Sequence, residues 1–406
     1  NPILICTVRV GSGRCVRGRP EARGEVGVAC GLVAAVRLWV RRRCAPGMRG
    51  LALLLCACAA RAADGVFQGE PSSSDVESSG SSSDVESSVV HGPFVHLEHV
   101  NLNAANFADA AAWYLSTLGL AADPRAAAVL AQTNAARSAV GAMQMPALLW
   151  ANCGFQQIHV PVGDALGAVG TAQTLPGRVS LVYSPAGFEA LRARLRFDGN
   201  AAVLQGVHGN VFEVRAARGD AYVGPGRDLQ RASTPPALGT PSECLGIDAV
   251  RFDVRTGAAA GICRFYRTVV GAASARDGTA GGAANCVIRV GSQQQLVFTE
   301  VGFALAAYDG HHIAVYTMAF DDMYHRVQKR GLVFNNPRFP QFTYDSLHDA
   351  RRWQEFRFKD IVDPDTGELL HQLEHEVRSL EHPAFAFKDR AASVARAATT
   401  AATAEL

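Results

Sequence analysis

The stretch HLEHVNLN at residues 96–103, together with residues 104–120 that follow it, decides the predicted fold. Val100 and Leu102 alternate with polar residues that include His99, which is the pattern of a half-buried strand. Apolar residues then recur at helical spacing until a glycine stops the run. The stretch therefore predicts a strand that presents a histidine on one face of a sheet, and an amphipathic helix packed on the other face.

The composition describes a soluble globular protein. The chain has 406 residues, of which 48% are hydrophobic and 19% charged, and its net charge is +2. This length is enough for two ordinary domains. The arginines are scattered and form no basic stripe interleaved with aromatic residues, so we expect no nucleic-acid partner. A small-molecule partner is expected instead, and the sequence leaves open whether the chain is a monomer or a homodimer.

The cysteines are unevenly placed along the chain. Six of the ten lie before residue 60, and none of the other four belongs to a CxxC pair, which argues against a zinc ribbon. For these four we expect buried free thiols rather than disulfides. They are Cys153, Cys244, Cys263 and Cys286.

The N-terminal part shows leader-like and linker-like segments. Residues 1–47 are interpreted as a leader or gene-model extension, or alternatively as a disordered basic arm. Residues 48–62 contain a positive start, a short apolar run and a small-residue cleavage pattern, which predict a signal peptide. The alternative is an organelle presequence. We therefore expect the secretory pathway or an organelle, with the cytoplasm as the alternative, and no membrane association after signal removal.

The next segment is polar and repetitive. Residues 63–93 contain SSSDVESS twice, at 72–79 and 81–88, and cannot bury apolar surface. We interpret them as a solvated linker.

Two blocks with parallel organisation form the rest of the chain. They span 94–216 and 244–380, with a Pro/Gly-rich connector at 217–243 and an Ala-rich tail at 381–406. Each block reads twice as a strand, a helix and two or three further strands. This gives four modules, whose first strands begin near residues 96, 178, 247 and 312. One module is too small to close a core alone, so we expect modules to pair and curl their sheets around a cavity.

The element ranges follow from apolar periodicity and turn residues. Further strands are expected at 147–151, 155–161, 178–183, 202–205, 211–215, 247–254, 286–290, 294–300, 312–318, 356–362 and 369–376, and further helices at 188–196, 258–270 and 321–330.

Several motifs resemble the glyoxalase-type module of the vicinal oxygen chelate superfamily, which includes glyoxalase, bleomycin-resistance and dioxygenase-like two-domain proteins. The motifs are His99-Val100-Asn101-Leu102 with Trp113-Tyr114 and Leu118-Gly119-Leu120, then Phe265-Tyr266 with Gly271, Gly310-His311-His312-Ile313-Ala314-Val315, and Asp363-Pro364-Asp365-Thr366-Gly367. The resemblance covers about residues 94–380. It implies an α+β fold of four βαβββ modules, paired into two domains with curved mixed sheets.

The resemblance also implies metal ligands on the first and last strand of a module. Module one offers His99 and His159. Module four offers His312, with His311 as a rival, and Glu374. The rivals of Glu374 are His371 and Glu376. Modules one and four would together build one site from His99, His159, His312 and Glu374.

Modules two and three offer much less. Module two has Arg178 where a histidine is expected, although Glu213 fits a closing glutamate. Module three has Asp248 or Arg251 on its first strand and Leu296 or Val297 on its last. These two modules would form a vestigial site.

These ligands suit one divalent ion, namely Fe²⁺, Ni²⁺, Zn²⁺ or Mn²⁺. The resemblance then implies a metal-dependent enzyme, a lyase/isomerase or an extradiol-type dioxygenase, acting on a small substrate with vicinal oxygens. Glu374 is the candidate for catalytic proton transfer. The alternatives are a metal-free protein that sequesters a small molecule, and a scaffold whose cavities are filled by side chains.

Overall fold

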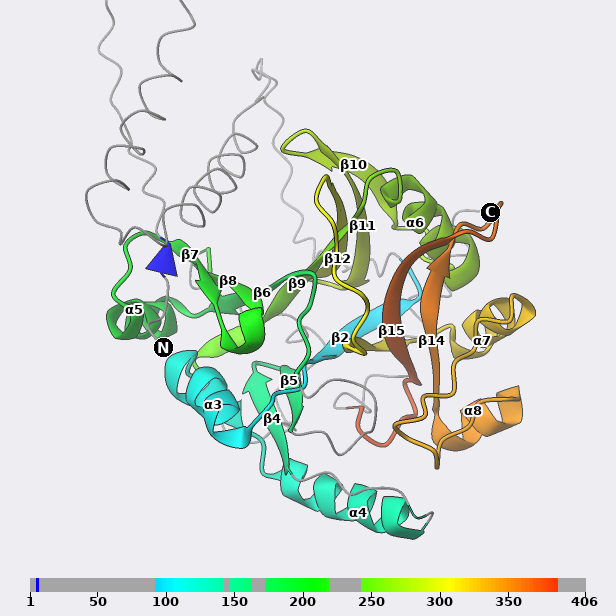
Figure 1. Cartoon of the computed structure of the whole chain (residues 1–406), viewed down its shortest axis with the longest axis horizontal. Helices are drawn as coiled ribbons and strands as arrows, with labels where there is room; N and C mark the ends of the chain where they lie inside the picture. Colours follow the sequence, from blue (N-terminus) through cyan, green and yellow to red (C-terminus); the bar gives the residue numbers. More distant parts are fainter. Residues whose placement is uncertain are drawn as a thin grey trace, which may run out of the picture. The chain divides into compact units, whose positions relative to one another are not determined.

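The computed structural model describes residues 5–6, 92–139, 141, 147–162, 172–218 and 242–385 (Figure 1). Apart from residues 280–282, these belong to one compact unit. The predicted signal peptide, almost all of the leader and linker, and most of the connector and tail lie outside the described residues.

The described strands form two mixed sheets, here named sheet A and sheet B. Sheet A has the order β1 (Ile5–Cys6), β7 (Ala201–Gln205), β8 (Val211–Ala216), β6 (Gly177–Tyr183), β9 (Cys244–Arg255), β12 (Gln294–Val301), β11 (Ala283–Gly291) and β10 (Arg276–Ala280). Sheet B has the order β14 (Glu355–Val362), β15 (Leu369–Ser379), β13 (His312–Thr317), β2 (Phe94–Asn101), β5 (Gln156–Val162), β4 (Ala147–Cys153) and β3 (Ala121–Ala122).

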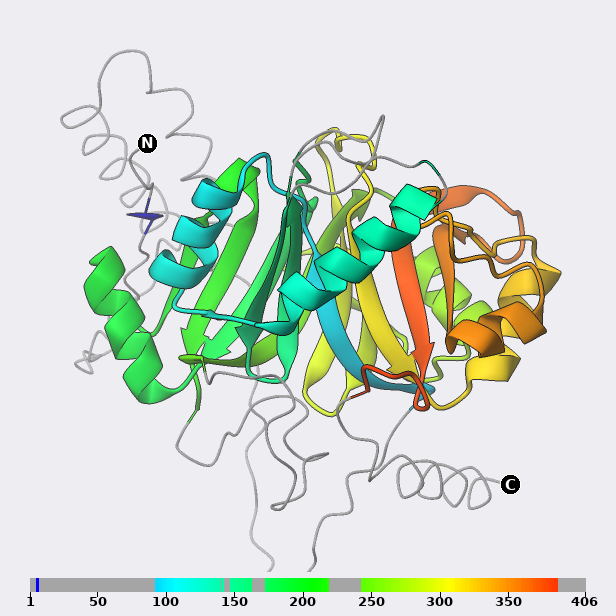
Figure 2. The same ribbon diagram turned by 90° about the horizontal axis from the view of Figure 1, so that it is seen from below.

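The predicted α+β class and the four-module plan are confirmed. Modules two and three meet where β6 pairs antiparallel with β9 in sheet A, and modules one and four meet where β2 pairs antiparallel with β13 in sheet B. Each sheet thus takes one module from each half of the sequence. Figure 2 shows the strands side by side, with α3 (Phe107–Ala111) and α5 (Pro185–Leu195) at one end and α7 (Phe320–Lys329) and α8 (Leu347–Trp353) at the other.

The first helix of modules one and three has the same unusual form. In module one, α3 begins after Asn106, whose side chain accepts a hydrogen bond from the Asp109 N–H, and continues into the π-helical turn η2 (Ala112–Thr117). In module three, α6 (Ala259–Phe265) continues into the π-helical turn η5 (Tyr266–Val270). The aromatic residues Trp113, Tyr114 and Tyr266 lie within these two π-helical turns.

The sequence pattern did not predict α8 or α4 (Arg125–Ala139). The α4 segment is rich in alanine, which has a high helix propensity but gives no apolar periodicity from which a helix is recognised. It packs beside β4 (Figure 1). The short helix η3 (Val207–Gly209) joins β7 to β8.

One hydrophobic core runs through both sheets. Phe252 on β9 stacks on Phe298 on β12, with ring centroids 5.1 Å apart. From η5, the Tyr266 hydroxyl donates to His375 Nε2 on β15 at 2.6 Å. Burial lowers the pKa of His375 to about 3, so its ring is a neutral acceptor. Module three therefore holds the central strand of module four in place.

The packed part of the chain continues beyond residue 380. Phe385 is buried, and its ring centroid lies 4.7 Å from that of Tyr316.

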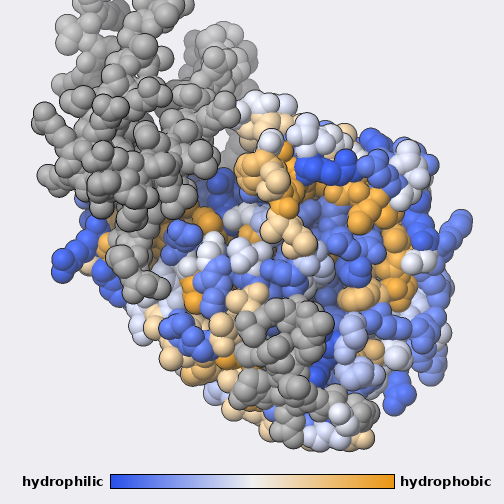
Figure 3. Space-filling view, viewed as in Figure 1, coloured by the Kyte–Doolittle hydropathy of each residue, from blue (hydrophilic) through white to orange (hydrophobic). Residues whose placement is uncertain are grey.

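On the face seen in Figure 3, the described surface mixes hydrophilic and hydrophobic residues. Among the described helices, none combines the length and the hydrophobicity that a membrane span requires.

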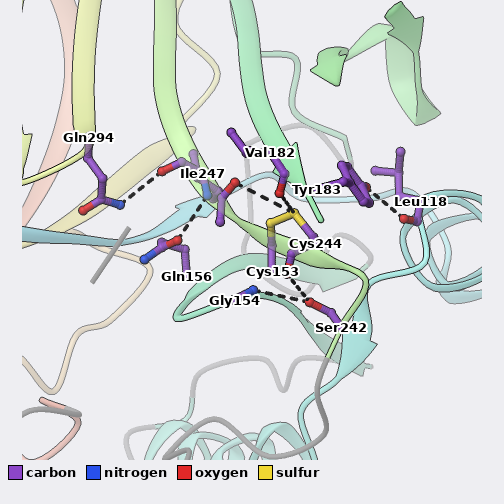
Figure 4. The surroundings of a disulfide bond; sticks show 11 residues. Leu118, Cys153, Gly154, Gln156, Val182, Tyr183, Ser242, Cys244, Ile247 and Gln294 are labelled. Carbon is purple, nitrogen blue, oxygen red and sulfur yellow. Dashed lines mark hydrogen bonds between the residues drawn. A yellow bond between two sulfur atoms is a disulfide. The ribbon is translucent and has the colours of Figure 1, made fainter. Parts of the chain in front are cut away.

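The expectation of free thiols is wrong for the four described cysteines. Cys153 is bonded to Cys244, with Cα atoms 4.7 Å apart (Figure 4). Cys263 is bonded to Cys286, with Cα atoms 5.5 Å apart. The first bond joins β4 of sheet B to β9 of sheet A. Sequence alone could not give this pairing, because 91 residues separate the two partners and only the fold brings them together.

We predict that the Cys263→Ala/Cys286→Ala double variant is less stable than the wild type by about 2–4 kcal/mol, since the bond closes a loop with a sequence separation of 23 residues. Urea unfolding under non-reducing conditions measures the difference, and the reduced wild type, which loses both disulfides, should be less stable than the unreduced variant. Alkylation of Cys263 in the native, unreduced protein would contradict the assignment.

Candidate metal centre

A β-bulge shapes the first strand of the candidate site. Along the β2–β13 pairing, Ala314 lies opposite His99 and Val315 opposite Leu97, so Glu98 is the extra residue. A regular strand would point Glu98 and His99 to opposite faces, whereas a bulge re-aims successive side chains. Glu98 can therefore contact the ring of its neighbour.

Buried glutamine side chains link the two sheets beside the bulge, Gln294 from sheet A and Gln156 from sheet B. Gln294 accepts a hydrogen bond from the Leu97 N–H at 2.9 Å, and its amide nitrogen donates to the carbonyl oxygens of Leu97 and Ile247 at 3.0 and 3.2 Å. Gln156 accepts from the Ile247 N–H at 3.1 Å (Figure 4). The backbone groups beside the bulge thus find partners although the ladder is interrupted.

Glu98 fixes the tautomer of His99. The Nδ1 atom of His99 lies 3.1 Å from Glu98 Oε2. Burial raises the pKa of Glu98, but the guanidinium of Arg378, the hydrogen bond with His99 and the two neighbouring histidines together outweigh it and hold the carboxyl well below its usual range. An ionised Glu98 only accepts, so Nδ1 carries a proton, and Nε2 is the ring nitrogen left to bind a metal. That Nε2 atom is buried and has no hydrogen-bond partner.

His99, His312 and Glu376 offer three donor atoms that lie within 4.8 Å of one another. Glu376 Oε2 is 3.9 Å from His99 Nε2 and 3.7 Å from His312 Nε2. All three residues are buried. Burial, with a further contribution from Arg357, lowers the pKa of His312 well below its ordinary value, so the ring is neutral as a metal ligand must be.

Two arginines hold the carboxylate of this group. Arg357 donates to Glu376 Oε2, and Arg378 pairs with Oε1. Burial raises the pKa of Glu376, but the charges of Arg357 and Arg378 prevail and hold it well below the usual range. Next to it, burial and the Glu376 charge raise the pKa of Glu355 to about 7. Two carboxyl groups therefore lie close enough on this face of sheet B to repel each other when both are ionised.

These residues fit a divalent ion. Two imidazoles and one carboxylate are suitable donors for Fe²⁺, Ni²⁺, Zn²⁺ or Mn²⁺, and an unpartnered buried nitrogen of His99 faces the position between them. Because metal–ligand bonds of about 2.0–2.2 Å hold donors closer together than 4.8 Å, the side chains must move slightly inward. The buried carboxylates at this site also outnumber the guanidinium groups beside them, which favours binding of a cation. The carboxylates are Glu98, Glu355, Glu374 and Glu376, and the guanidiniums are Arg338, Arg357 and Arg378.

Of the four ligands predicted from the sequence, the structure brings His99 and His312 together. His159 lies beside them, but its ring stacks on His99 with centroids 3.7 Å apart, and its Nε2 donates to Gln157 Oε1 at 2.8 Å. The burial of His159 and the neighbouring His99 lower its pKa well below the ordinary value. Its ring supports His99 rather than joining the donor group.

The predicted Glu374 is not in the donor group. Both of its oxygens accept hydrogen bonds from Asn336, at 2.8 and 2.9 Å, and Oε1 also accepts from Arg357 at 2.7 Å. The rival His311 pairs with Asp309 at 2.7 Å, and the rival His371 contacts the rings of Phe252 and Phe298 in the core.

Glu376, left as a rival by the sequence, is the carboxylate that meets both histidines. A signal for it is present in the internal repeat. The last strand of module two reads Glu213-Val214-Arg215, and that of module four reads Glu376-Val377-Arg378. Aligning these two triplets selects Glu376 over Glu374.

Sheet A carries a counterpart of this site without the histidines. The β6–β9 pairing has the same register and a bulge at the same point as β13–β2, and Asp248 occupies the bulge. Asp248 pairs with Arg215 at 2.5 Å, as Glu98 pairs with Arg378. The corresponding residues are Ala249 for His99, Arg178 for His312 and Glu213 for Glu376.

The first-strand position that the sequence left between Asp248 and Arg251 is therefore Ala249, which offers no ligand. Glu213 lies 3.1 Å from Arg178 Nε and 3.5 Å from Arg251 Nε. Two arginine side chains thus lie where a metal ion would have to approach Glu213. Among the described residues, sheet A therefore offers no comparable metal site.

No family model and no curated protein matches this sequence. Similar solved structures include a Bacillus subtilis protein assigned as a dioxygenase, at 11% identity and a TM-score of 0.44, covering 75% of this chain and 90% of that one. Glyoxalase I from Zea mays matches at 11% identity and a TM-score of 0.39, with 73% and 94% covered. The 2,2',3-trihydroxybiphenyl 1,2-dioxygenase from Sphingomonas wittichii matches at 11% and 0.23, with 70% and 90% covered. At such identities and TM-scores, the activities of these proteins are not carried over. Dioxygenase and glyoxalase structures are thus among those that this chain resembles.

Proposed function

We propose that this chain is a metal-dependent enzyme that acts on a small substrate with two adjacent oxygens, with His99, His312 and Glu376 as ligands of one divalent ion. The observation that carries the proposal is the convergence of these three buried donors, with an unpartnered His99 nitrogen between them.

The two histidines and one carboxylate favour oxygenase chemistry as the first reaction class to test. A bound ion would act as a Lewis acid toward the two substrate oxygens. Three protein ligands leave positions open for substrate and water, and two histidines with one carboxylate are the donor set of non-haem Fe²⁺ oxygenases. Ring-opening oxidation of a catechol is therefore the first candidate, and isomerase or lyase chemistry on a hydroxy-carbonyl compound or an oxoaldehyde adduct is the second.

The surrounding side chains hold the ligands in place. Glu98 orients His99, and the His159 ring lies between the rings of His99 and Trp150, with centroids 3.7 and 4.4 Å away. Arg357 and Arg378 hold Glu376. If Glu374 transfers a proton, as the sequence suggests, Oε2 is the better placed oxygen, because Oε1 already accepts from both Asn336 and Arg357.

The second candidate function is metal-free binding of a small molecule. It is supported by the pairing of Glu376 with two arginines, which neutralises the carboxylate without an ion. Metal content distinguishes the two functions.

The two disulfides support a proposed location in an oxidising compartment, such as the secretory pathway. The cytoplasm would be favoured if the native protein had four reduced thiols at these positions.

We predict that the full chain, purified without chelator, carries about one divalent transition metal, and that Glu376→Gln lowers its metal affinity by at least about 100-fold. This variant loses a side chain that would bind the metal directly, although the amide can still accept from Arg357. Elemental analysis and competition with a chromophoric chelator measure the content and the affinity.

The matched control is Glu374→Gln, two residues away on the same strand, for which we expect less than a 10-fold change. The His99→Ala/His312→Ala double variant should carry no metal while keeping the wild-type circular dichroism spectrum. A wild type without metal, or a larger loss in Glu374→Gln than in Glu376→Gln, would contradict the ligand assignment.

We also predict that Glu98→Gln weakens metal binding by about 10- to 100-fold, because the residue behind a ligating histidine sets its tautomer and basicity. The same chelator competition measures it. Asp248→Asn, at the equivalent bulge of sheet A, should leave metal affinity unchanged, and equal losses in the two variants would show that the effect is only structural.

A further inference from the structure

We propose that Arg338 forms a carboxylate-binding subsite beside the metal centre, so that the substrate carries a carboxylate next to its adjacent oxygens. This inference rests on the proposed function, because it names the substrate class of the same site.

The guanidinium of Arg338 is buried and only partly satisfied. The residue is 5% exposed. Its Nη1 atom donates to the carbonyl oxygen of Gly310 at 3.2 Å, whereas its Nε and Nη2 atoms have no hydrogen-bond partner. In the part of the chain that the structure describes, no carboxylate lies within ion-pair distance of it. A buried, unpaired charge is costly, so its retention calls for a partner of opposite charge.

The subsite lies next to the candidate ligands. Gly310, which accepts from Arg338, is two residues before His312. On the neighbouring strand, Glu374 lies directly beside His312, and its charge acts on Arg338. The guanidinium therefore lies near the ligand histidine of module four.

The loop that carries Arg338 is held by several contacts. The Arg338 N–H donates to Asn336 Oδ1 at 2.9 Å, and the amide of Asn336 donates to both oxygens of Glu374. Arg137 on α4 donates to the Arg338 carbonyl oxygen. The Phe339 ring lies over the guanidinium of Arg357 at 5.0 Å. Glu374 thus acts as the anchor that positions Arg338, which gives a reason for a carboxylate at this place other than metal ligation.

The two unpartnered nitrogens of the Arg338 guanidinium determine which kind of anion can bind there. The Nε–H and an Nη2–H point the same way and match the two oxygens of a carboxylate. Only one guanidinium is unpaired here, and the negative charges of Glu374 and Asp309 also act on it. This balance favours a monoanion over a dianion such as phosphate. A 2-oxo acid or a hydroxy acid has the required carboxylate beside an oxygen.

The test compares two probes of the same size that both have adjacent oxygens, pyruvate and butane-2,3-dione, of which only pyruvate is charged. Isothermal titration calorimetry measures binding to the full chain loaded with Mn²⁺, and to the same chain in EDTA. We expect wild type to bind pyruvate at least 10-fold more tightly than the dione, both with Mn²⁺ and in EDTA. Arg338→Gln should lower this preference by about 10- to 100-fold with Mn²⁺, where the ion itself still favours the carboxylate, and abolish it in EDTA, since a charge-assisted pair contributes that much. Arg338→Lys, which keeps the charge but loses the fork, should keep part of the preference.

The matched control is Arg352→Gln, at an exposed arginine on α8, which should behave as wild type. Equal binding of the two probes by wild type, an unchanged preference in Arg338→Gln, or tighter binding of inorganic phosphate or chloride than of pyruvate would overturn the inference. If the wild type carries no metal but shows the Arg338-dependent preference in EDTA, the proposed metal function fails while the carboxylate subsite stands.

Discussion

The candidate site depends on the ion pair between Glu98 and Arg378, formed at a β-bulge. The bulge places Glu98 and His99 on one face, Arg378 keeps Glu98 ionised, and Glu98 in turn fixes the proton on His99 Nδ1. Arg378 also pairs with Glu376, so one guanidinium positions both the histidine of module one and the carboxylate of module four. Without it, Glu98 would lose its ion pair with a guanidinium and Glu376 would keep only its pair with Arg357, at a cost of several kcal/mol.

The two sheets share the bulge and its ion pair but differ in the histidines. Asp248 and Arg215 form the same ion pair at the same bulge in sheet A, where no histidine is present. The bulge and its ion pair therefore belong to the module pairing itself. Sheet B adds two histidines to this frame, which make up the candidate metal centre with Glu376, and Arg178 takes the place of one of them in sheet A.

The sequence predicted the modules well because strand alternation, helix periodicity and turn residues are local signals. It also placed His99 and His312 in one site, since the repeat pairs modules one and four. It ranked Glu374 above Glu376 because the choice depends on register across β13 and β15, where His312 lies opposite Glu374 yet faces Glu376 diagonally. The Cys153–Cys244 bond and the unpartnered Arg338 depend on contacts between distant segments, which no local pattern contains.

The most direct test of the central claim is a crystal structure of the full chain loaded with Co²⁺, with anomalous scattering measured at the cobalt edge. The account predicts one strong anomalous peak about 2.0–2.2 Å from His99 Nε2, His312 Nε2 and a Glu376 carboxylate oxygen. A peak bound by Glu374 or His159 instead, or no peak on this face of sheet B, would contradict it.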